Sequence, residues 1–302
     1  SIADQTRFED GGWSLAGIET QRLMEKIRQN SIPLGEYVKG KIYRGVLTGL
    51  NEAFVIDQTT RDRLIAEDLK SVELIKPCLL GKDIKRYGID YQNLYMIFTK
   101  RGTKIKEYPA IHNYLLKFKE KLMPRPKDWK GKEWKGRKPG PYQWFETQDP
   151  VAYYKEFEKP KIIWGNLAQK PKFAMDTDGY YINAPGVIIP VEDYYLLGIM
   201  NSSLFYTFIS EVAAGRRGGF FEYKPIYVSQ MPIHQINIKD PKEVENRYSL
   251  IQLVKRRIEL EKKSTPTPRQ KERKRTEIEI IESAIESLVC ELYQINRVSL
   301  KD

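Results

Sequence analysis

The stretch Lys41-Ile-Tyr-Arg-Gly-Val-Leu-Thr-Gly-Leu-Asn-Glu-Ala-Phe-Val-Ile-Asp57 is the most informative part of this 302-residue chain. Two short apolar runs, 42–47 and 53–56, flank Thr48-Gly49-Leu50-Asn51. Glycine and asparagine adopt positive φ at low cost, which a tight turn requires. The stretch therefore predicts two strands joined by a turn, followed by a helix that Asp57 caps.

Short apolar segments separated by Gly, Pro, Asn and Asp continue to about residue 233. This punctuation is typical of a mixed α/β (α+β) fold made of short elements. Residues 213–219 are expected to form a flexible turn. The expected helices are 58–65, 71–75, 108–122, 193–201 and 202–212, and the expected strands are 94–99, 161–164, 172–175, 180–182 and 186–189.

Beyond residue 240 the apolar residues recur at helical spacing in two stripes. Pro266 and Pro268 interrupt the pattern between the stripes, so we expect an antiparallel helical hairpin. The hairpin either packs on its own domain or binds a partner. The first stripe is Val244, Tyr248, Ile251, Val254 and Ile258, and the second is Ile278, Ile281, Ile285, Leu288, Leu292 and Ile295.

The chain is long enough for one large domain or two smaller ones. We expect a linker helix within 1–37, a main domain over 38–239 and the helical hairpin over 240–302. Because the sequence begins without methionine, the linker is expected to follow a further N-terminal part of a longer protein.

The charge balance is basic, with a formal net charge of +11 and a pI of about 9.3. The excess is concentrated: residues 101–138 contain thirteen Lys/Arg and four Asp/Glu, whereas residues 240–302 contain fourteen and twelve. Such a local excess favours a polyanionic partner, most often nucleic acid and less often an acidic membrane surface. A basic protein without any such partner remains the alternative.

The two cysteines, Cys78 and Cys290, are far apart and lie in apolar surroundings. They are expected to be buried free thiols in a reducing compartment, the cytoplasm. No apolar run reaches the roughly 18 residues that span a bilayer, and the N-terminus lacks the pattern of a signal peptide.

Residues 41–57 resemble the opening of the TaqI-like C-terminal specificity domain. Further strings that resemble this family follow in the family's order over roughly residues 40–233, and residues 286–293 resemble its helical tail. A shared order makes the resemblance more specific than any single string. The further strings are Ile75-Lys-Pro-Cys-Leu-Leu-Gly-Lys-Asp-Ile-Lys-Arg-Tyr87, Lys159-Pro-Lys-Ile-Ile-Trp-Gly-Asn166, residues 180–189, Tyr195-Leu-Leu-Gly-Ile-Met-Asn-Ser-Ser-Leu-Phe-Tyr206 and Arg217-Gly-Gly-Phe-Phe-Glu-Tyr-Lys-Pro-Ile-Tyr-Val-Ser-Gln-Met-Pro-Ile233.

The resemblance implies the target-recognition domain of an adenine-specific DNA methyltransferase, or of a type IIG restriction enzyme that fuses a methyltransferase to its reader. Double-stranded DNA and the methyltransferase domain of the same parent chain are then the expected partners. No cofactor is expected in this chain, and S-adenosylmethionine is expected in the methyltransferase part. A nuclease in the parent remains open.

Basic and aromatic residues cluster in three places that suit DNA binding. Residues 124–142 combine lysines with tryptophans, which suits groove insertion or base stacking, or else form a merely solvated loop. Gly215-Arg216-Arg217-Gly218-Gly219-Phe220-Phe221 supplies arginines beside flexible backbone, and its phenylalanines are more often core anchors. Lys82, Lys85 and Arg86 are either phosphate contacts or a solvated charge cluster.

We expect DNA contacts from residues chosen for charge, aromatic character or an exposed turn. For Thr48, Gly49 and Asn51 an ordinary structural turn is the competing interpretation. The expected DNA-binding residues are Arg44, Thr48, Asn51, Lys82, Lys85, Arg86, Arg101, Lys130, Lys132, Trp134, Arg137, Lys138, Trp144, Lys172, Arg216, Arg217 and Lys224.

The chain shows no pattern typical of a catalytic centre. It has no Asn/Asp-Pro-Pro-aromatic string for a flipped adenine and no glycine-rich loop after a strand for a methyl donor. His112 and His234 lie outside any metal-ligand spacing. We therefore expect a non-catalytic recognition domain without a metal. The alternatives are a nuclease domain and a basic protein-interaction module with a coiled-coil hairpin.

Overall fold

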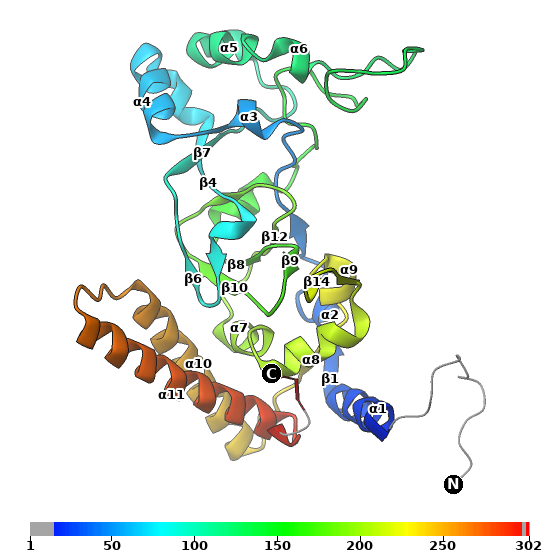
Figure 1. Cartoon of the computed structure of the whole chain (residues 1–302), viewed down its shortest axis with the longest axis vertical. Helices are drawn as coiled ribbons and strands as arrows, with labels where there is room; N and C mark the ends of the chain where they lie inside the picture. The colour runs from blue at the N-terminus through cyan, green and yellow to red at the C-terminus, as the bar shows by residue number, and fades with distance from the viewer. Residues whose placement is uncertain (1–14, 298–299, 302) are drawn as a thin grey trace.

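The computed structural model describes residues 15–297 and 300–301. The molecule is elongated, with helices at both ends and small sheets between them (Figure 1). Its apolar side chains form three clusters along this axis, which we call the lower, middle and upper cores. Within the described residues, no helix combines the length and the apolar character needed to cross a membrane.

Helices and one two-stranded sheet surround the lower core (Figure 1). In that sheet β1 (Ser31–Pro33) pairs antiparallel with β15 (Pro232–His234), so two segments far apart in the sequence are joined. The helices are α1 (Leu15–Arg28), α2 (Leu34–Tyr37), α7 (Tyr194–Met200), α8 (Ser203–Val212), α9 (Pro225–Val228), α10 (Pro241–Lys262) and α11 (Pro268–Leu292).

A four-stranded antiparallel sheet separates the lower core from the middle core. Its order is β10 (Phe173–Asp176), β8 (Lys161–Trp164), β12 (Val187–Ile189) and β2 (Tyr43–Arg44). Successive side chains of a strand point to opposite faces, and here both faces are buried. Ile162, Trp164, Phe173, Met175, Val187 and Ile189 belong to the lower core, and Ile163, Ala174 and Ile188 belong to the middle core.

A second sheet connects the middle core to the upper one, in the order β11 (Tyr181–Ile182), β4 (Ile75–Leu79), β7 (Leu94–Ile97) and β3 (Val55–Ile56). Strands β11 and β4 are parallel, and the other pairs are antiparallel. The upper helices are α3 (Asn51–Phe54), α4 (Gln58–Glu67), η1 (Leu69–Glu73), η3 (Ile105–Glu107), α5 (Pro109–Leu116) and α6 (Lys119–Leu122). The remaining elements are η2 (Gly81–Asp83), β5 (Ile84–Lys85), β6 (Gly88–Ile89), η4 (Tyr154–Glu158), β9 (Leu167–Ala168), β13 (Gly215–Arg216) and β14 (Phe220–Glu222).

The mixed fold class predicted from the sequence is confirmed, as is the cap predicted at Asp57, and Asp193 and Ser202 cap two further helices. The carboxylate of Asp57 accepts from the Thr60 amide at 2.8 Å, and that of Asp193 accepts from the Leu196 amide at 2.9 Å. The Ser202 hydroxyl accepts from the Phe205 amide at 3.3 Å. Each cap satisfies an amide that has no partner inside its own helix.

The predicted hairpin over residues 42–56 is wrong. β2 pairs with β12, and β3 pairs with β7, so the two runs enter different sheets. Between them the chain forms the short helix α3. The physical reason is burial: Val46 belongs to the middle core, whereas Ala53 and Phe54 belong to the upper core. Runs this short are stabilised by whichever core they reach, because local preference contributes little.

Three other predictions of element boundaries are wrong in detail. The helix expected over 108–122 is divided into α5 and α6 by a bend at Phe118, whose φ is −107°, and this bend lets Leu115 and Leu122 both reach the upper core. The short helix expected over 71–75 is the 3₁₀ helix η1, which is shifted to Leu69–Glu73. The expected turn over 213–219 contains β13, which pairs with β14.

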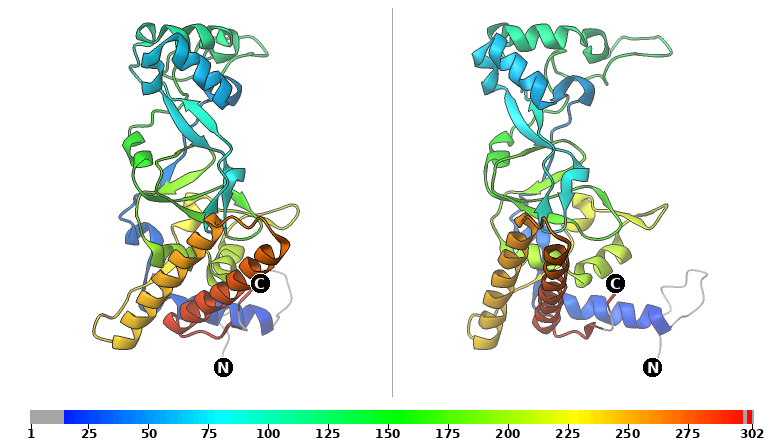
Figure 2. Two further views of the ribbon diagram at one scale, coloured as in Figure 1. Left: turned by 90° about the vertical axis from the view of Figure 1, so that its left-hand side faces the viewer. Right: turned by 60° about the vertical axis from the view of Figure 1, so that its left-hand side comes forward.

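The C-terminal helical hairpin is confirmed, and α10 and α11 lie side by side in both views (Figures 1 and 2). In α11 the predicted stripe is inward, with Ile281 and Ile285 buried. In α10 the predicted stripe is wrong at its start, because Val244 and Tyr248 are 44% and 65% exposed. The buried face of α10 is instead formed by Leu250, Val254, Arg257 and Leu260.

The lower core crosses both boundaries expected at residues 37/38 and 239/240. Leu23, Met24 and Ile27 of α1 are buried in it together with side chains of α7, α8, α10 and α11. The helix expected as a linker is therefore an integral part of this core. The first fourteen residues of that expected linker lie outside the described residues.

A partly buried ionic cluster joins the helical hairpin to the sheets. Arg86, between β5 and β6, donates to Glu282 at 2.6 Å and to the carbonyl of Asn201 at 2.8 Å. Glu286 of α11 accepts from the Ser203 amide at 3.0 Å and lies 3.5 Å from Arg86. Burial is the largest influence on Glu286 and raises the pKa of its carboxyl group.

This raised pKa predicts a specific pH dependence of stability. The folded state favours protonated Glu286, so the contribution is complete below the ordinary pKa of 4.5 and is lost as the pH rises through the raised folded-state value. Glu286→Gln is expected to remove this trend, which is limited to about 1.4 kcal/mol per pH unit for one proton. Urea unfolding at several pH values measures it. Glu282→Gln, which alters a more exposed partner of Arg86, is the control, and parallel curves for wild type and Glu286→Gln would contradict the prediction.

Candidate nucleic-acid interface

The turn at residues 48–51 is closed from within. Thr48 is 1% exposed, and its hydroxyl donates to Oδ1 of Asn51 at 2.7 Å. Gly49 has a φ of +79°, and a Cβ there would lie 2.6 Å from both Cδ of Arg137 and Oε1 of Gln148. The prediction that Thr48 contacts DNA is wrong because its hydroxyl is buried, whereas Asn51 lies at the surface.

Arg137 is a structural residue. It is 4% exposed, and its five N–H groups donate to the carbonyl oxygens of Leu122, Thr48, Glu146, Gln143 and Trp144. A guanidinium group has five donors in all, so none is left for a phosphate or a base. The prediction that Arg137 contacts DNA is therefore wrong.

Two further arginines are held by the protein itself. Arg101 is half-buried and donates to the carbonyls of Thr147 and Gln148. Arg86 is occupied by the cluster at the helical hairpin. Both guanidinium groups thus have partners within the protein, and the side chains stay 33% exposed for Arg86 and 26% exposed for Arg101. Arg44 is different, since its side chain is 51% exposed and lies 3.6 Å from Asp149.

Residues 125–136, which we call the arm, project from the upper end of the molecule (Figure 1). The arm leaves and returns at one point, where the Arg125 amide donates to the Arg137 carbonyl and the Arg137 amide donates to the Met123 carbonyl, both at 3.0 Å. Lys130 and Lys132 are exposed on it, and Lys138 is exposed just beyond it. These three predicted residues are free to meet a ligand.

The two predicted tryptophans of this region differ in position. Trp134 is half-buried on the arm, and its indole N–H donates to the Met123 carbonyl at 3.1 Å. Trp144 is half-buried and packs against the upper core beside His112 and Phe145. Trp144 is therefore mainly a core anchor.

Strands β13 and β14 with the turn between them, residues 215–222, form a second projection, which we call the glycine hairpin. Arg216 and Arg217 are exposed on it, and Gly218 and Gly219 have φ of +79° and +73°. The arm and the glycine hairpin extend on the same side of the molecule, at different heights along its axis (Figure 2, right).

Glu222 organises the charges of the glycine hairpin. Its carboxylate accepts from Nε of Arg216 at 2.8 Å and lies 2.6 Å from Nζ of Lys224. Hydrogen bonds from Lys224 and Arg216 lower the pKa of Glu222, so it is ionised at neutral pH. Arg217 has no ion pair with any residue in the described ranges. Lys172, like Arg217, is exposed.

Lys82 of η2 and Lys85 of β5 are exposed just before the β5–β6 turn, and Nζ of Lys85 donates to the Lys82 carbonyl at 2.9 Å. This turn lies near α10, on the other side of the molecule from the glycine hairpin (Figure 1). The structure therefore does not bring Lys82 and Lys85 together with the arm and the glycine hairpin.

The residues predicted to bind DNA did not include two that the structure makes prominent. Trp129, near the end of the arm, is 45% exposed, and Glu222 holds two of the predicted cations. The sequence signal that could have identified Trp129 is the pair of tryptophans, Trp129 and Trp134, on either side of Gly131. Glu222 carried no comparable signal, because its role depends on a strand turn.

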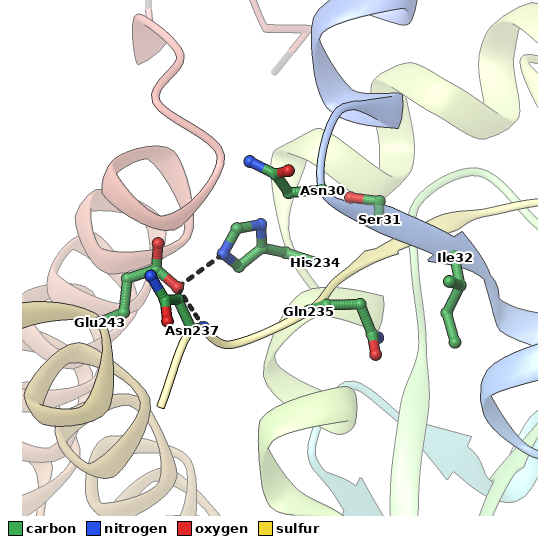
Figure 3. A pocket seen from close by; sticks show the side chains of 7 residues that line it. All are labelled: Asn30, Ser31, Ile32, His234, Gln235, Asn237 and Glu243. Carbon is green, nitrogen blue, oxygen red and sulfur yellow. Dashed lines mark hydrogen bonds and ion pairs between the residues drawn. The ribbon is translucent and has the colours of Figure 1, made fainter. Parts of the chain in front are cut away.

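A polar hollow of about 440 Å³ lies between β1, β15 and the start of α10 (Figure 3). Nε2 of His234 is 3.1 Å from Oε2 of Glu243, which also accepts from the Asn237 amide at 2.8 Å. These contacts fasten α10 to β15. Within the described residues, no group of three or more His, Cys, Asp or Glu side chains is arranged to hold a metal ion.

Both cysteines are free and buried, as expected. Burial raises the pKa of Cys78 to about 12 and that of Cys290 to about 11. Both therefore remain thiols at neutral pH and are poor nucleophiles.

Comparison with known proteins gives a family match and a structural match. The sequence model of the TaqI-like C-terminal specificity domain matches residues 76–233. No curated protein matches the chain significantly.

A solved structure of the type IIL restriction-modification enzyme MmeI in complex with DNA is similar in fold, with a TM-score of 0.59 and 12% sequence identity. The similarity covers 88% of this chain and 33% of that one, so the chain spans about a third of the length of the enzyme it matches.

Proposed function

Because this chain belongs to the TaqI-like C-terminal specificity domain family, we propose that it recognises a specific sequence in double-stranded DNA for a restriction-modification enzyme. The observation that carries the proposal is the pair of basic projections, the arm and the glycine hairpin, on one side of an elongated molecule (Figure 2). The similarity in fold to an enzyme solved with DNA supports it.

The two projections have different roles in this proposal. Arg216, Arg217 and Lys224 contact phosphates and set the register, which contributes affinity without sequence information. The arm supplies base contacts, since Lys130 and Lys132 are exposed there on a backbone with a fixed base. A good two-pronged base contact contributes about 1–3 kcal/mol of discrimination.

We further propose that the chain itself is not catalytic and that its parent is an adenine-N6 methyltransferase of type IIG, located in the cytoplasm. The family resemblance supports the methyltransferase, and the two buried thiols support a reducing compartment. S-adenosylmethionine, the methyl donor, would then bind in the methyltransferase domain of the same parent chain. This chain would deliver the DNA to it.

A protein-interaction module is the second candidate. Ile238, Val244 and Tyr248 are 85%, 44% and 65% exposed around the start of α10. Exposed apolar side chains grouped in this way are typical of contact surfaces. In this alternative, DNA contact would be incidental to a protein partner.

Selection of bound sequences from a randomised duplex pool tests the proposal. The wild-type chain is expected to enrich one motif, and exchange of residues 125–136 for a Gly/Ser segment of equal length is expected to lose positions of that motif. The exchange should leave the melting temperature nearly unchanged, because the arm lies outside the three cores and the base of the arm is kept.

The matched control exchanges only the exposed Lys138 for alanine, which leaves the arm intact. An unaltered motif after exchange of the arm would move base reading to another part of the molecule. Salt-sensitive binding by the wild type without any enriched motif would favour the interaction module or a need for the methyltransferase part.

A further inference from the structure

The arm carries an exposed indole surrounded by positive charge. Trp129 is 45% exposed, whereas Trp164 is 1% exposed and Trp134 and Trp144 are half-buried. Lys127, Lys130 and Lys132 lie beside it in the sequence, and none of them forms an ion pair within the part of the chain that the structure describes. A flat apolar ring is therefore presented together with unpaired cations.

The Trp129 ring rests on a fixed support. The Trp134 ring lies edge-on against it, with centroids 5.0 Å apart and planes at 68°. Trp134 is itself anchored by the hydrogen bond to Met123. A Cβ at Gly131 would lie 2.4 Å from Cζ2 of Trp129, so only glycine lets the backbone approach the ring this closely.

The base of the arm is equally constrained. The hydrogen bonds at Met123, Arg125 and Arg137 close it, and the five carbonyl contacts of Arg137 tie it to the upper core. Fixing a contact group before binding reduces the ordering cost at the interface. Trp129 is thus preorganised toward a ligand outside the protein.

We propose that Trp129 stacks on a nucleobase of the bound DNA, at a base step that opens when the arm enters the groove. The inference rests on the proposed function, because it presupposes that the chain binds DNA. Every base has a π face on which an indole stacks, and neighbouring lysines hold the adjacent phosphates. Inside an intact duplex these faces are covered by neighbouring bases, so stacking requires an unstacked step.

Binding of the full chain to two randomised duplex pools tests this inference. One pool is fully paired, and the other has a single unpaired base at its centre. The wild type is expected to prefer the second pool. Trp129→Ala is expected to lose about tenfold or more in affinity for it with an unchanged salt slope, and Trp129→Phe should keep most of the preference because it keeps a ring.

Lys127→Ala is the matched control, since it removes a neighbouring charge and is expected to weaken binding to both pools equally with a salt slope lower by about 1. If Trp129→Ala keeps the wild-type preference while the wild type binds DNA, the inference fails and the proposed function stands. A wild type that binds neither pool overturns the proposed function. A lowered melting temperature for Trp129→Ala would also count against the inference, because it would make Trp129 a packing residue.

Discussion

Replacement of Arg137 by alanine is expected to lower the free energy of unfolding by about 3–5 kcal/mol. The reason is the loss of the donors for five carbonyl oxygens around a buried guanidinium group. Burial lowers the pKa of Arg137 to about 10, which still leaves it charged at neutral pH. The aromatic rings of Tyr142 and Phe54, whose centroids lie 4.5 Å and 5.6 Å from Cζ of Arg137, would also lose their cation–π partner.

Urea unfolding and limited proteolysis with trypsin measure this effect. The arm should be cut faster in Arg137→Ala, because its base is no longer held. Arg137→Lys is expected to recover less than half of the loss, since an ammonium group cannot reproduce five donors in a planar fork. Lys138→Ala alters an exposed neighbour and should change stability by no more than about 0.5 kcal/mol. Equal stabilities for Arg137→Ala and Lys138→Ala would contradict the structural role.

Reversal of charge at Arg216 and Arg217 is expected to weaken binding to all duplexes by about 50- to 100-fold at about 0.1 M salt. Each lost phosphate contact changes the salt slope by about 0.9, so two contacts flatten it by about 1.8. Because phosphates carry no sequence information, the preferred motif should stay the same. Titrations of one labelled duplex at several salt concentrations measure both quantities.

Glu222→Gln is expected to act in the opposite direction. In the free protein its carboxylate occupies Arg216 and Lys224, so a phosphate must displace it. Removal of the negative charge should therefore tighten binding severalfold for every sequence. Glu211→Gln, whose partner is Lys301, is the matched control with no expected change.

For the Arg216/Arg217 variant, an unaltered salt slope would falsify the proposal that the glycine hairpin contacts phosphates.

Local sequence signals predicted local structure well. Asp57, Asp193 and Ser202 were predictable as caps because a cap depends on amides two or three residues away. The helical hairpin was predictable because its apolar pattern extends over two long helices. The family match over residues 76–233 was predictable because several strings that resemble the family occur there in its order.

The failures come from long-range partners. Arg137 looked like any other cation of a lysine-rich loop, yet one of its acceptors, Thr48, lies 89 residues away. Arg86 likewise pairs with Glu282, which lies 196 residues away. Nothing in the neighbouring sequence separates an arginine that folds inward from one that faces DNA.

The mistaken hairpin at residues 42–56 has the same origin. Strands of two residues, such as β2 and β3, carry too little pattern to identify their neighbours. Their partners, β12 and β7, are chosen by the cores that the flanking side chains reach. Sequence alone therefore gave the kind of element expected there more reliably than its pairing.

Because β1 pairs with β15, the chain between these two strands begins and ends at positions one strand spacing apart, about 5 Å. The helices that flank this segment, α1 and α10, are therefore held in position by the β1–β15 pair and by the His234–Glu243 contact. This holds whatever the length of the chain between the two strands. Insertions or deletions at the upper end of the molecule leave this arrangement of α1 and α10 in place. A chain built in this way can vary at its upper end while its lower end keeps the same geometry.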